Sequence, residues 1–150
     1  LVSKPDSADT LIADLLRTHD IQNLEEYAEW LKNHILYRPD GKTDAWATPP
    51  ETLRNGSGDC EDFSQLTAAV AQVMGYQPHF LAMARAGQWH AICAFNDNGR
   101  YIWFDNQELK KTEARTLEEF GRYITGRYQY PLLLEFDSSA QRWKVIYRQS

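Results

Sequence analysis

The residues best suited to chemistry in this 150-residue chain are a cysteine, a histidine and an aspartate, in that order. Cys60 follows the glycine-rich run GSGD (56–59) and begins an apolar segment of helical spacing. At the start of a helix the backbone N–H groups lack internal partners and the dipole favours negative charge. A thiolate, the nucleophilic form of cysteine, is stabilised there, and the same N–H groups can bind an oxyanion. Cys60 is therefore a candidate nucleophile, with a buried structural cysteine as the alternative interpretation.

A nucleophilic cysteine needs a base, and the base needs a group that orients it. His90 lies in the strand-like segment QWHAICAF, where an ordinary core or surface histidine is the alternative interpretation. Asp105 ends the segment RYIWFD and is the candidate orienting acid. Trp89 and Trp103 lie in the same two segments and fit either the walls of a cleft or core packing.

Hairpin geometry tests whether His90 and Asp105 can meet. Asn98-Gly99 is a strong signal for a two-residue turn, which places Asp105 opposite Ile92 and diagonal to His90. If Asp97-Asn98 forms the turn instead, Asp105 lies directly opposite His90. Both alternatives put the two side chains on one face of the sheet.

The second cysteine, Cys93, is three residues from His90 and falls on the other face of that strand. This favours a small buried apolar residue and argues against a disulfide with Cys60. Neither cysteine has zinc-ligand spacing, and the chain contains no P-loop, dinucleotide fingerprint or HExxH motif.

The surrounding pattern predicts an α+β fold in a single domain, residues 1–150. Apolar residues that recur about every 3.6 positions, the period of an α-helix, predict helices over 8–19, 23–37, 60–74 and 116–125. Segments with a period of two and many aromatic and β-branched residues predict strands over 78–86, 88–96, 100–105, 128–136 and 142–148. Residues 38–59 are rich in proline and glycine and are predicted to form a long irregular connection, of the kind that often carries function.

Composition excludes several classes of protein. The chain is 43% hydrophobic and 25% charged, as in a folded domain, and its net charge of −5 argues against a nucleic-acid-binding protein. No apolar stretch is long enough to span a membrane. Residue 1 is a leucine, which is compatible with a trimmed chain or with a mature form that has lost a leader.

Three motifs in order carry a family resemblance. The run WATPPETLRNGSGDCEDFSQLTAAVAQVMGY, then WHAICAF, then WFDN, resembles the bacterial transglutaminase-like cysteine proteinases of the papain-like superfamily. The similarity extends from Trp46 to Asn106, and G-x-G-D-C-E-D-F is its specific part. It implies a papain-like (transglutaminase-like) fold, with a cysteine at a helix N-terminus packed on an antiparallel sheet. It also implies Cys60 as nucleophile, His90 as general base and Asp105 as the orienting acid.

The resemblance extends to an oxyanion donor and a metal. The Trp46 indole N–H would assist the Cys60 backbone N–H in binding the oxyanion. The acids flanking the cysteine hold calcium in that family, and Asp59 and Glu61 match those positions. The alternative is that Asp59 is a helix N-cap whose capping pattern is completed by Asp62. The acyl-transfer chemistry itself requires no cofactor.

The function implied is that of a cysteine peptidase acting on a protein or peptide substrate through a thioester. A transglutaminase or amidase would use the same three residues, since only the acceptor that resolves the thioester differs. A binding domain that keeps the fold without turnover is the third interpretation. The family includes periplasmic proteases that release surface adhesins, which implies a periplasmic or exported location.

Overall fold

The computed structural model describes residues 5–39 and 46–149, with side chains described from residue 8 onward. Its helices are α1 (Pro5–Thr18), α2 (Leu24–His34), α3 (Pro49–Asn55), α4 (Cys60–Val73) and α5 (Leu117–Tyr128). The longer strands are β3 (His79–Arg85), β4 (Gln88–Asp97), β5 (Arg100–Asp105), β6 (Glu108–Lys111), β7 (Leu132–Asp137) and β8 (Arg142–Arg148). Two short segments, β1 (Leu36–Tyr37) and β2 (Ser57–Gly58), pair in parallel.

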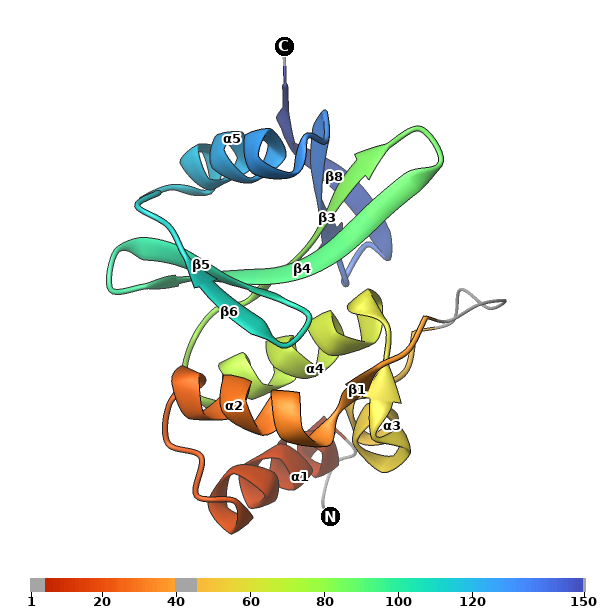
Figure 1. The fold of residues 1–150 in the computed structure, drawn as a ribbon, viewed down its shortest axis with the longest axis vertical. Coiled ribbons are helices and arrows are strands. Elements are labelled where there is room, and N and C mark those ends of the chain that lie inside the picture. The colour runs from red at the N-terminus through yellow and green to blue at the C-terminus, as the bar shows by residue number, and fades with distance from the viewer. Residues whose placement is uncertain (1–4, 40–45, 150) are drawn as a thin grey trace.

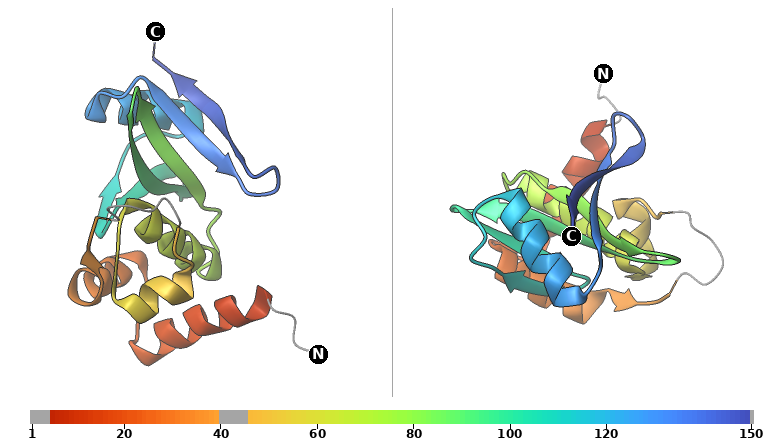
Figure 2. Two further views of the ribbon diagram at one scale, coloured as in Figure 1. Left: turned by 90° about the vertical axis from the view of Figure 1, so that its right-hand side faces the viewer. Right: turned by 90° about the horizontal axis from the view of Figure 1, so that it is seen from above.

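The longer strands form one antiparallel sheet in the order β6-β5-β4-β3-β7-β8. Helices α1–α4 lie on one side of this sheet and α5 lies on the other (Figure 1). Figure 2 shows the β7–β8 hairpin running from the α5 end of the molecule toward the layer that contains α4. The predicted α+β class, with helices packed on an antiparallel sheet, is confirmed.

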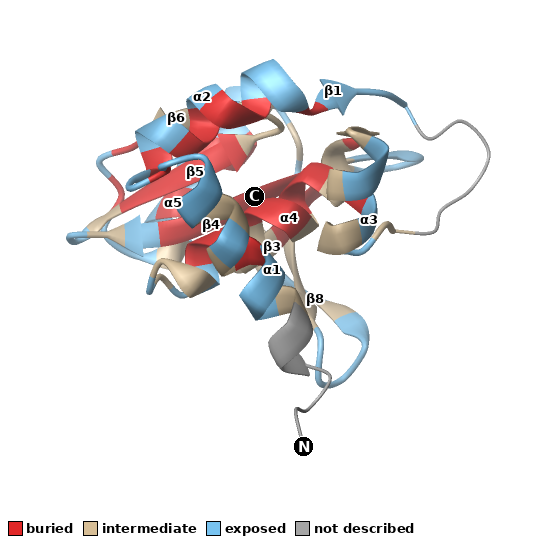
Figure 3. Ribbon diagram, turned by 90° about the horizontal axis from the view of Figure 1, so that it is seen from below, coloured by how far each residue is buried: buried red, intermediate tan, exposed pale blue. Residues whose placement is uncertain are grey.

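Each face of the sheet has its own apolar core. The core toward α4 contains Phe63, Leu66 and Val70 of that helix and Cys93 and Phe104 of the sheet. The core toward α5 includes Ile92, Trp103, Phe120, Ile124 and Leu133. Burial is concentrated on α4 and on the central strands (Figure 3). Alternation along β4 thus separates Cys93 from Ile92, as predicted.

The β4–β5 register follows the first of the two turn alternatives. Asp97 pairs with Arg100 and Cys93 pairs with Phe104, so Asn98-Gly99 forms the two-residue turn. Both turn residues have positive φ angles, 54° and 90°, which suit the right-handed twist of the strands. Asp105 therefore continues β5 on the same face as His90.

Several predicted boundaries were wrong for local reasons. The second helix ends at His34 and not at residue 37, because Ile35 is extended and the next residues pair with β2. The predicted irregular connection over 38–59 contains α3, which begins with a capping box between Thr48 and Glu51 and ends at Asn55, with Gly56 as its C-cap. Strand β6 was not predicted.

The last helix and the strand after it also differ from the prediction. The helix runs to Tyr128, three residues beyond the predicted end at 125, and β7 begins at Leu132 and not at 128. Gln129, in the left-handed conformation with φ 61°, ends the helix.

Candidate active site

The start of α4 presents Cys60 within a tightly bonded turn. Asp59 is the N-cap, and its Oδ1 accepts the Asp62 N–H at 3.2 Å. Asp62 Oδ2 in turn accepts the Asp59 N–H at 3.1 Å, and its Oδ1 accepts the Ala47 N–H at 2.8 Å. Gly58 is required here because a Cβ at that position would lie 2.6 Å from the Asp62 Cβ. Cys60 is a free, partly exposed thiol at the first position of the helix.

His90 and Asp105 form a direct hydrogen bond, with 2.7 Å between Nε2 and Oδ1. Strand β4 pairs with β5 only between Cys93 and Asp97, so at His90 its paired neighbour is β3 alone. The side chains remain accessible, with 23% of His90 and 19% of Asp105 exposed. Asp105 engages Nε2, which leaves Nδ1 available to another partner.

A third residue at the pair comes from α5 and was not found from the sequence. The Tyr128 hydroxyl donates a hydrogen bond to Asp105 Oδ2 at 2.6 Å, and its ring centroid lies 6.0 Å from that of His90. Asp105 thus has one oxygen on His90 and the other on Tyr128. No motif marks Tyr128, because only the packing of α5 against the sheet brings it to this position.

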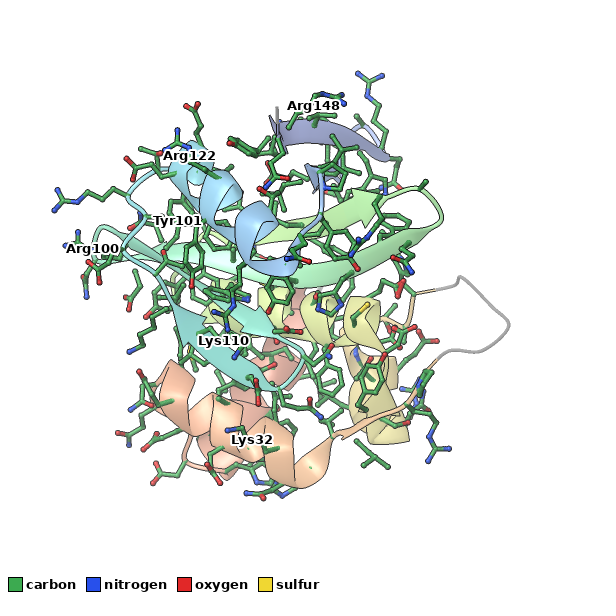
Figure 4. All side chains as sticks on the ribbon, turned by 45° about the horizontal axis from the view of Figure 1, so that its top comes forward. Lys32, Arg100, Tyr101, Lys110, Arg122 and Arg148 are labelled. Atoms are coloured by element: carbon green, nitrogen blue, oxygen red, sulfur yellow. The ribbon has the colours of Figure 1, made fainter. Side chains whose placement is uncertain are left out.

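The surroundings of His90 and Asp105 favour the charged forms of both side chains. Burial acts to lower the pKa of His90, but hydrogen bonds with Asp105 and Cys60, together with their negative charges, outweigh it and raise that pKa to about 10. Burial acts to raise the pKa of Asp105, whereas hydrogen bonds from His90 and Tyr128 and the charge of Lys110 hold it below its ordinary value. Figure 4 shows Lys110 on β6. At neutral pH the site therefore holds an imidazolium next to the sulfur, the arrangement that favours a thiolate.

Tyr37 lies beside these groups and was also not found from the sequence. The parallel β1–β2 pairing places Tyr37 next to Gly58, just before the start of α4. Its ring stacks on Phe63 with centroids 6.4 Å apart, and 44% of the residue is exposed. Burial, followed by the negative charges of Cys60 and its acidic neighbours, raises the pKa of Tyr37. The tyrosine is thus a neighbour of the candidate nucleophile.

The three acidic residues around Cys60, which are Asp59, Glu61 and Asp62, differ in how well they could bind a cation. Burial raises the pKa of Asp59 to about 7; the Asp62 N–H opposes this shift, and the charges of Glu61 and Asp62 add to it. Asp62 uses both oxygens in hydrogen bonds, so the capping interpretation of Asp59 and Asp62 describes the structure. Within residues 8–39 and 46–149, no three His, Cys, Asp or Glu side chains form a metal-binding group. The carboxylates of Asp59 and Glu61 fit a hard cation only if backbone carbonyls complete its shell.

The tryptophans separate into different environments. Trp103 is 1% exposed and belongs to the core toward α5, so core packing is the correct interpretation for it. Trp89 is 54% exposed, which excludes core packing. Trp46 lies next to Ala47, which is bonded to the first turn of α4, and its ring packs on Phe80 and Trp143.

Comparisons with known proteins identify the family and the fold. Residues 10–106 match the family described as the transglutaminase-like superfamily. The UPF0252 protein MJ1282 of Methanocaldococcus jannaschii is 28% identical over 64% of this chain, which spans 33% of that protein.

Solved structures share the fold. Calcium-bound LapG of Legionella pneumophila superposes with a TM-score of 0.58 at 19% identity, covering 100% of this chain and 84% of LapG. The EGTA-treated form of LapG superposes with a TM-score of 0.52 at 22% identity, covering 77% of this chain and 70% of LapG. A candidate cysteine protease from Cytophaga hutchinsonii gives 0.54 at 20% identity, covering 74% of this chain and 43% of that protein. None of the described helices is long and apolar enough to cross a membrane.

Proposed function

Since this chain belongs to the transglutaminase-like superfamily, we propose that it is a cysteine peptidase that hydrolyses a protein or peptide substrate with Cys60, His90 and Asp105. The observation that carries the proposal is the hydrogen bond between His90 and Asp105, on a histidine whose pKa is also raised by Cys60, which begins a helix. The cysteine-protease-type neighbours support the same class of activity.

Acyl transfer proceeds in two steps, which are acylation of Cys60 and hydrolysis of the resulting thioester. The Cys60 thiolate attacks the amide carbonyl carbon, and the imidazolium of His90 gives its proton to the leaving amine as the C–N bond breaks. The resulting thioester is attacked by water, from which His90 takes a proton. Breaking the thioester C–S bond releases a carboxylic acid and restores the thiolate–imidazolium pair. Asp105 holds the ring and stabilises its charge, and Tyr128 holds Asp105.

The oxyanion of each tetrahedral intermediate lies at the N-terminus of α4. The Cys60 N–H is free of an intrahelical partner, as are other first-turn N–H groups that no side chain caps. The Trp46 indole N–H is the proposed second donor. The capping box already uses the Asp62 N–H, which is therefore not available to the oxyanion.

Product analysis after incubation with unfolded protein tests the proposal and separates the alternatives. We expect new peptide termini from the wild type and from Cys93→Ala, but none from Cys60→Ala. Dansylcadaverine, a primary amine, is included as a competing acceptor. Its incorporation without new termini would identify a transglutaminase, and neither product from the folded wild type would identify a binding domain.

We further propose that calcium binds beside the nucleophile through Asp59 and Glu61, with backbone carbonyls of residues 55–58 completing the shell. The carbonyls of Gly56 and Gly58 already accept the N–H groups of Leu36 and Arg38, so they bind the ion through their remaining lone pairs. A divalent cation would relieve the repulsion that contributes to the high pKa of Asp59. The calcium-bound and EGTA-treated LapG structures support the choice of metal.

Calorimetry on chelator-treated protein tests the calcium site. We expect heat of binding in the wild type and its loss in Asp59→Ala. Glu51→Ala is the matched control, because Glu51 caps the neighbouring helix α3 and lies outside the proposed shell. No heat at millimolar calcium, together with full activity in EGTA, would contradict the site.

The location implied by the family resemblance is periplasmic or exported, with a protein substrate as partner. Fractionation of cells that produce the natural gene product, followed by immunoblotting, checks this. Recovery of the protein in the cytoplasmic fraction would contradict it.

A further inference from the structure

The backbone of Tyr37 is fixed at the start of α4. The Leu36 N–H donates to the Gly56 carbonyl at 2.9 Å. The Arg38 N–H donates to the Gly58 carbonyl at 2.8 Å. These two bonds hold β1 on either side of Tyr37, whose Cα lies opposite that of Gly58. The short strand that leads into α4 therefore also sets the position of Tyr37.

The Tyr37 side chain lies along the first turn of α4. Its ring stacks on that of Phe63, with an interplanar angle of 12° and centroids 6.4 Å apart. Phe63 is three residues after Cys60, so these two side chains project from neighbouring positions on one face of the helix. Phe63 is 1% exposed and Tyr37 is 44% exposed, so the tyrosine covers the buried ring and has its other side in solvent. The phenol thus lies over the helix face from which Cys60 projects.

The charges that act on the phenol indicate where its hydroxyl lies. After burial, the negative charge of Cys60 raises the pKa of Tyr37 most, and Asp59 and Glu61 add to the shift. The charge of Asp105 contributes as well, although that residue belongs to the sheet and not to α4. A hydroxyl on which both Cys60 and Asp105 act lies near the gap between the helix and the sheet, where a substrate carbonyl would bind.

The position of Tyr37 fits the oxyanion better than the leaving amine. Tyr37 and the Cys60 amide both belong to the helical layer, whereas His90 lies on β4 of the sheet (Figure 1). His90 protonates the leaving amine, so the amine lies on the side of the sheet. The carbonyl oxygen then points toward the N-terminus of α4, where backbone N–H groups lack intrahelical partners. A phenol beside Gly58 is on that side.

We propose that the Tyr37 hydroxyl is a further catalytic residue, which donates a hydrogen bond to the oxyanion. The inference rests on the proposed peptidase function and adds a donor to the Cys60 N–H and the Trp46 indole. When the thiolate attacks, the carbonyl π electrons move to oxygen, which accepts the phenol O–H without taking its proton. The bond weakens again when the carbonyl re-forms and the amine leaves. The hydroxyl therefore stabilises the transition state more than the bound substrate.

Kinetics of Tyr37→Phe on fluorescein-labelled unfolded casein, with calcium in the buffer, test this role. Phenylalanine keeps the stack on Phe63 and removes only the hydroxyl. We expect kcat to fall on the order of 10- to 100-fold with KM unchanged. Tyr123→Phe is the matched control and should keep the wild-type kcat, because Tyr123 is 41% exposed but lies on α5 across the sheet.

Two measurements on the same variant distinguish an oxyanion donor from a residue that acts on the thiolate. A peptide aldehyde built on a mapped casein cleavage site takes the Cys60 sulfur at its carbonyl carbon and leaves an oxygen where the oxyanion forms. Its inhibition constant should rise in Tyr37→Phe by about the factor by which kcat falls. Iodoacetamide alkylates Cys60 by displacing iodide and forms no oxyanion, so the alkylation rate should stay within about twofold of the wild type.

Each outcome decides between the proposals. Equal kcat and equal aldehyde inhibition in Tyr37→Phe and Tyr123→Phe would overturn the role of Tyr37 and leave the peptidase intact. Alkylation that slows in parallel with kcat would also overturn it, because the hydroxyl would then act on the thiolate. Absence of cleavage by the wild type, matching Cys60→Ala, would overturn the peptidase function on which the role depends.

Discussion

Replacing Asp105 by asparagine should lower the pKa of His90 by roughly two units while leaving the fold in place. In the wild type the imidazole has a pKa of about 10, and the Asp105 carboxylate 2.7 Å away is a principal cause. Asparagine keeps the size of the side chain and can still hydrogen-bond to the ring, but it carries no charge. The experiment therefore isolates the electrostatic contribution of Asp105.

The size of the effect follows from the geometry. Unit charges about 4 Å apart attract by about 4 kcal/mol at an effective dielectric constant of about 20, which is roughly three pKa units. The side chains are 23% and 19% exposed, so solvent screening reduces the expected shift to about two units. We therefore expect the His90 midpoint to move from about 10 to about 8.

Nitrogen-15 NMR of the histidine rings between pH 5 and 11 measures the shift, with the His90 signals assigned as those absent from His90→Gln. Glu135→Gln is the matched control, because it removes the carboxylate that lies 2.6 Å from His79 and should leave the His90 titration unchanged. A His90 midpoint in Asp105→Asn within half a unit of the wild-type value would refute the electrostatic role of Asp105.

The His90–Asp105 interaction also makes the stability of the protein depend on pH, in a direction that follows from the raised pKa of His90. The folded-state pKa of His90 is raised from 6.5 to about 10, so its contribution is fully present below pH 6.5 and is lost as the pH rises through about 10. Urea denaturation should therefore show the largest difference between wild type and Asp105→Asn near pH 6. The difference should shrink toward pH 10.

Two further predictions concern residues that the structure places around the site. Gly58→Ala should destabilise the protein by about 1 to 3 kcal/mol in thermal unfolding, because the new Cβ would lie 2.6 Å from the Asp62 Cβ. The control Gly126→Ala, at an open position of α5, should instead stabilise the protein. Tyr128→Phe removes a hydrogen bond to Asp105 and should lower kcat on the order of tenfold with little change in KM. Steady-state kinetics against Tyr123→Phe checks this, and equal values for the two variants would show that the hydroxyl of Tyr128 plays no part.

The sequence predicted the features that depend on local chemistry. A glycine-rich run before Cys60 and apolar residues at helical spacing after it predicted a helix start, and the structure has α4 beginning at that cysteine. Alternation on either side of Asn98-Gly99 predicted that His90 and Asp105 share a face, and the observed register places them there. Both inferences used short-range rules, which a single sequence carries.

Features that depend on packing between distant segments could not be predicted. Tyr128 reaches Asp105 because α5 packs across the sheet, and Tyr37 reaches the site because β1 pairs with β2. Neither position has an unusual residue or spacing. The exposed Trp89 and the buried Trp103 looked equivalent in sequence, and only their burial separates them.

Selective alkylation of the two cysteines tests the central claim most directly, because it needs no substrate. Intact protein is treated briefly with iodoacetamide near pH 6.5 and mapped by peptide mass spectrometry. Cys60 should react rapidly, since it is accessible and lies beside the imidazolium of His90. Cys93 should stay unmodified, since it is fully buried and burial raises the pKa of its thiol. Slow labelling of Cys60, no faster than a free thiol and unchanged in His90→Gln, would contradict the account.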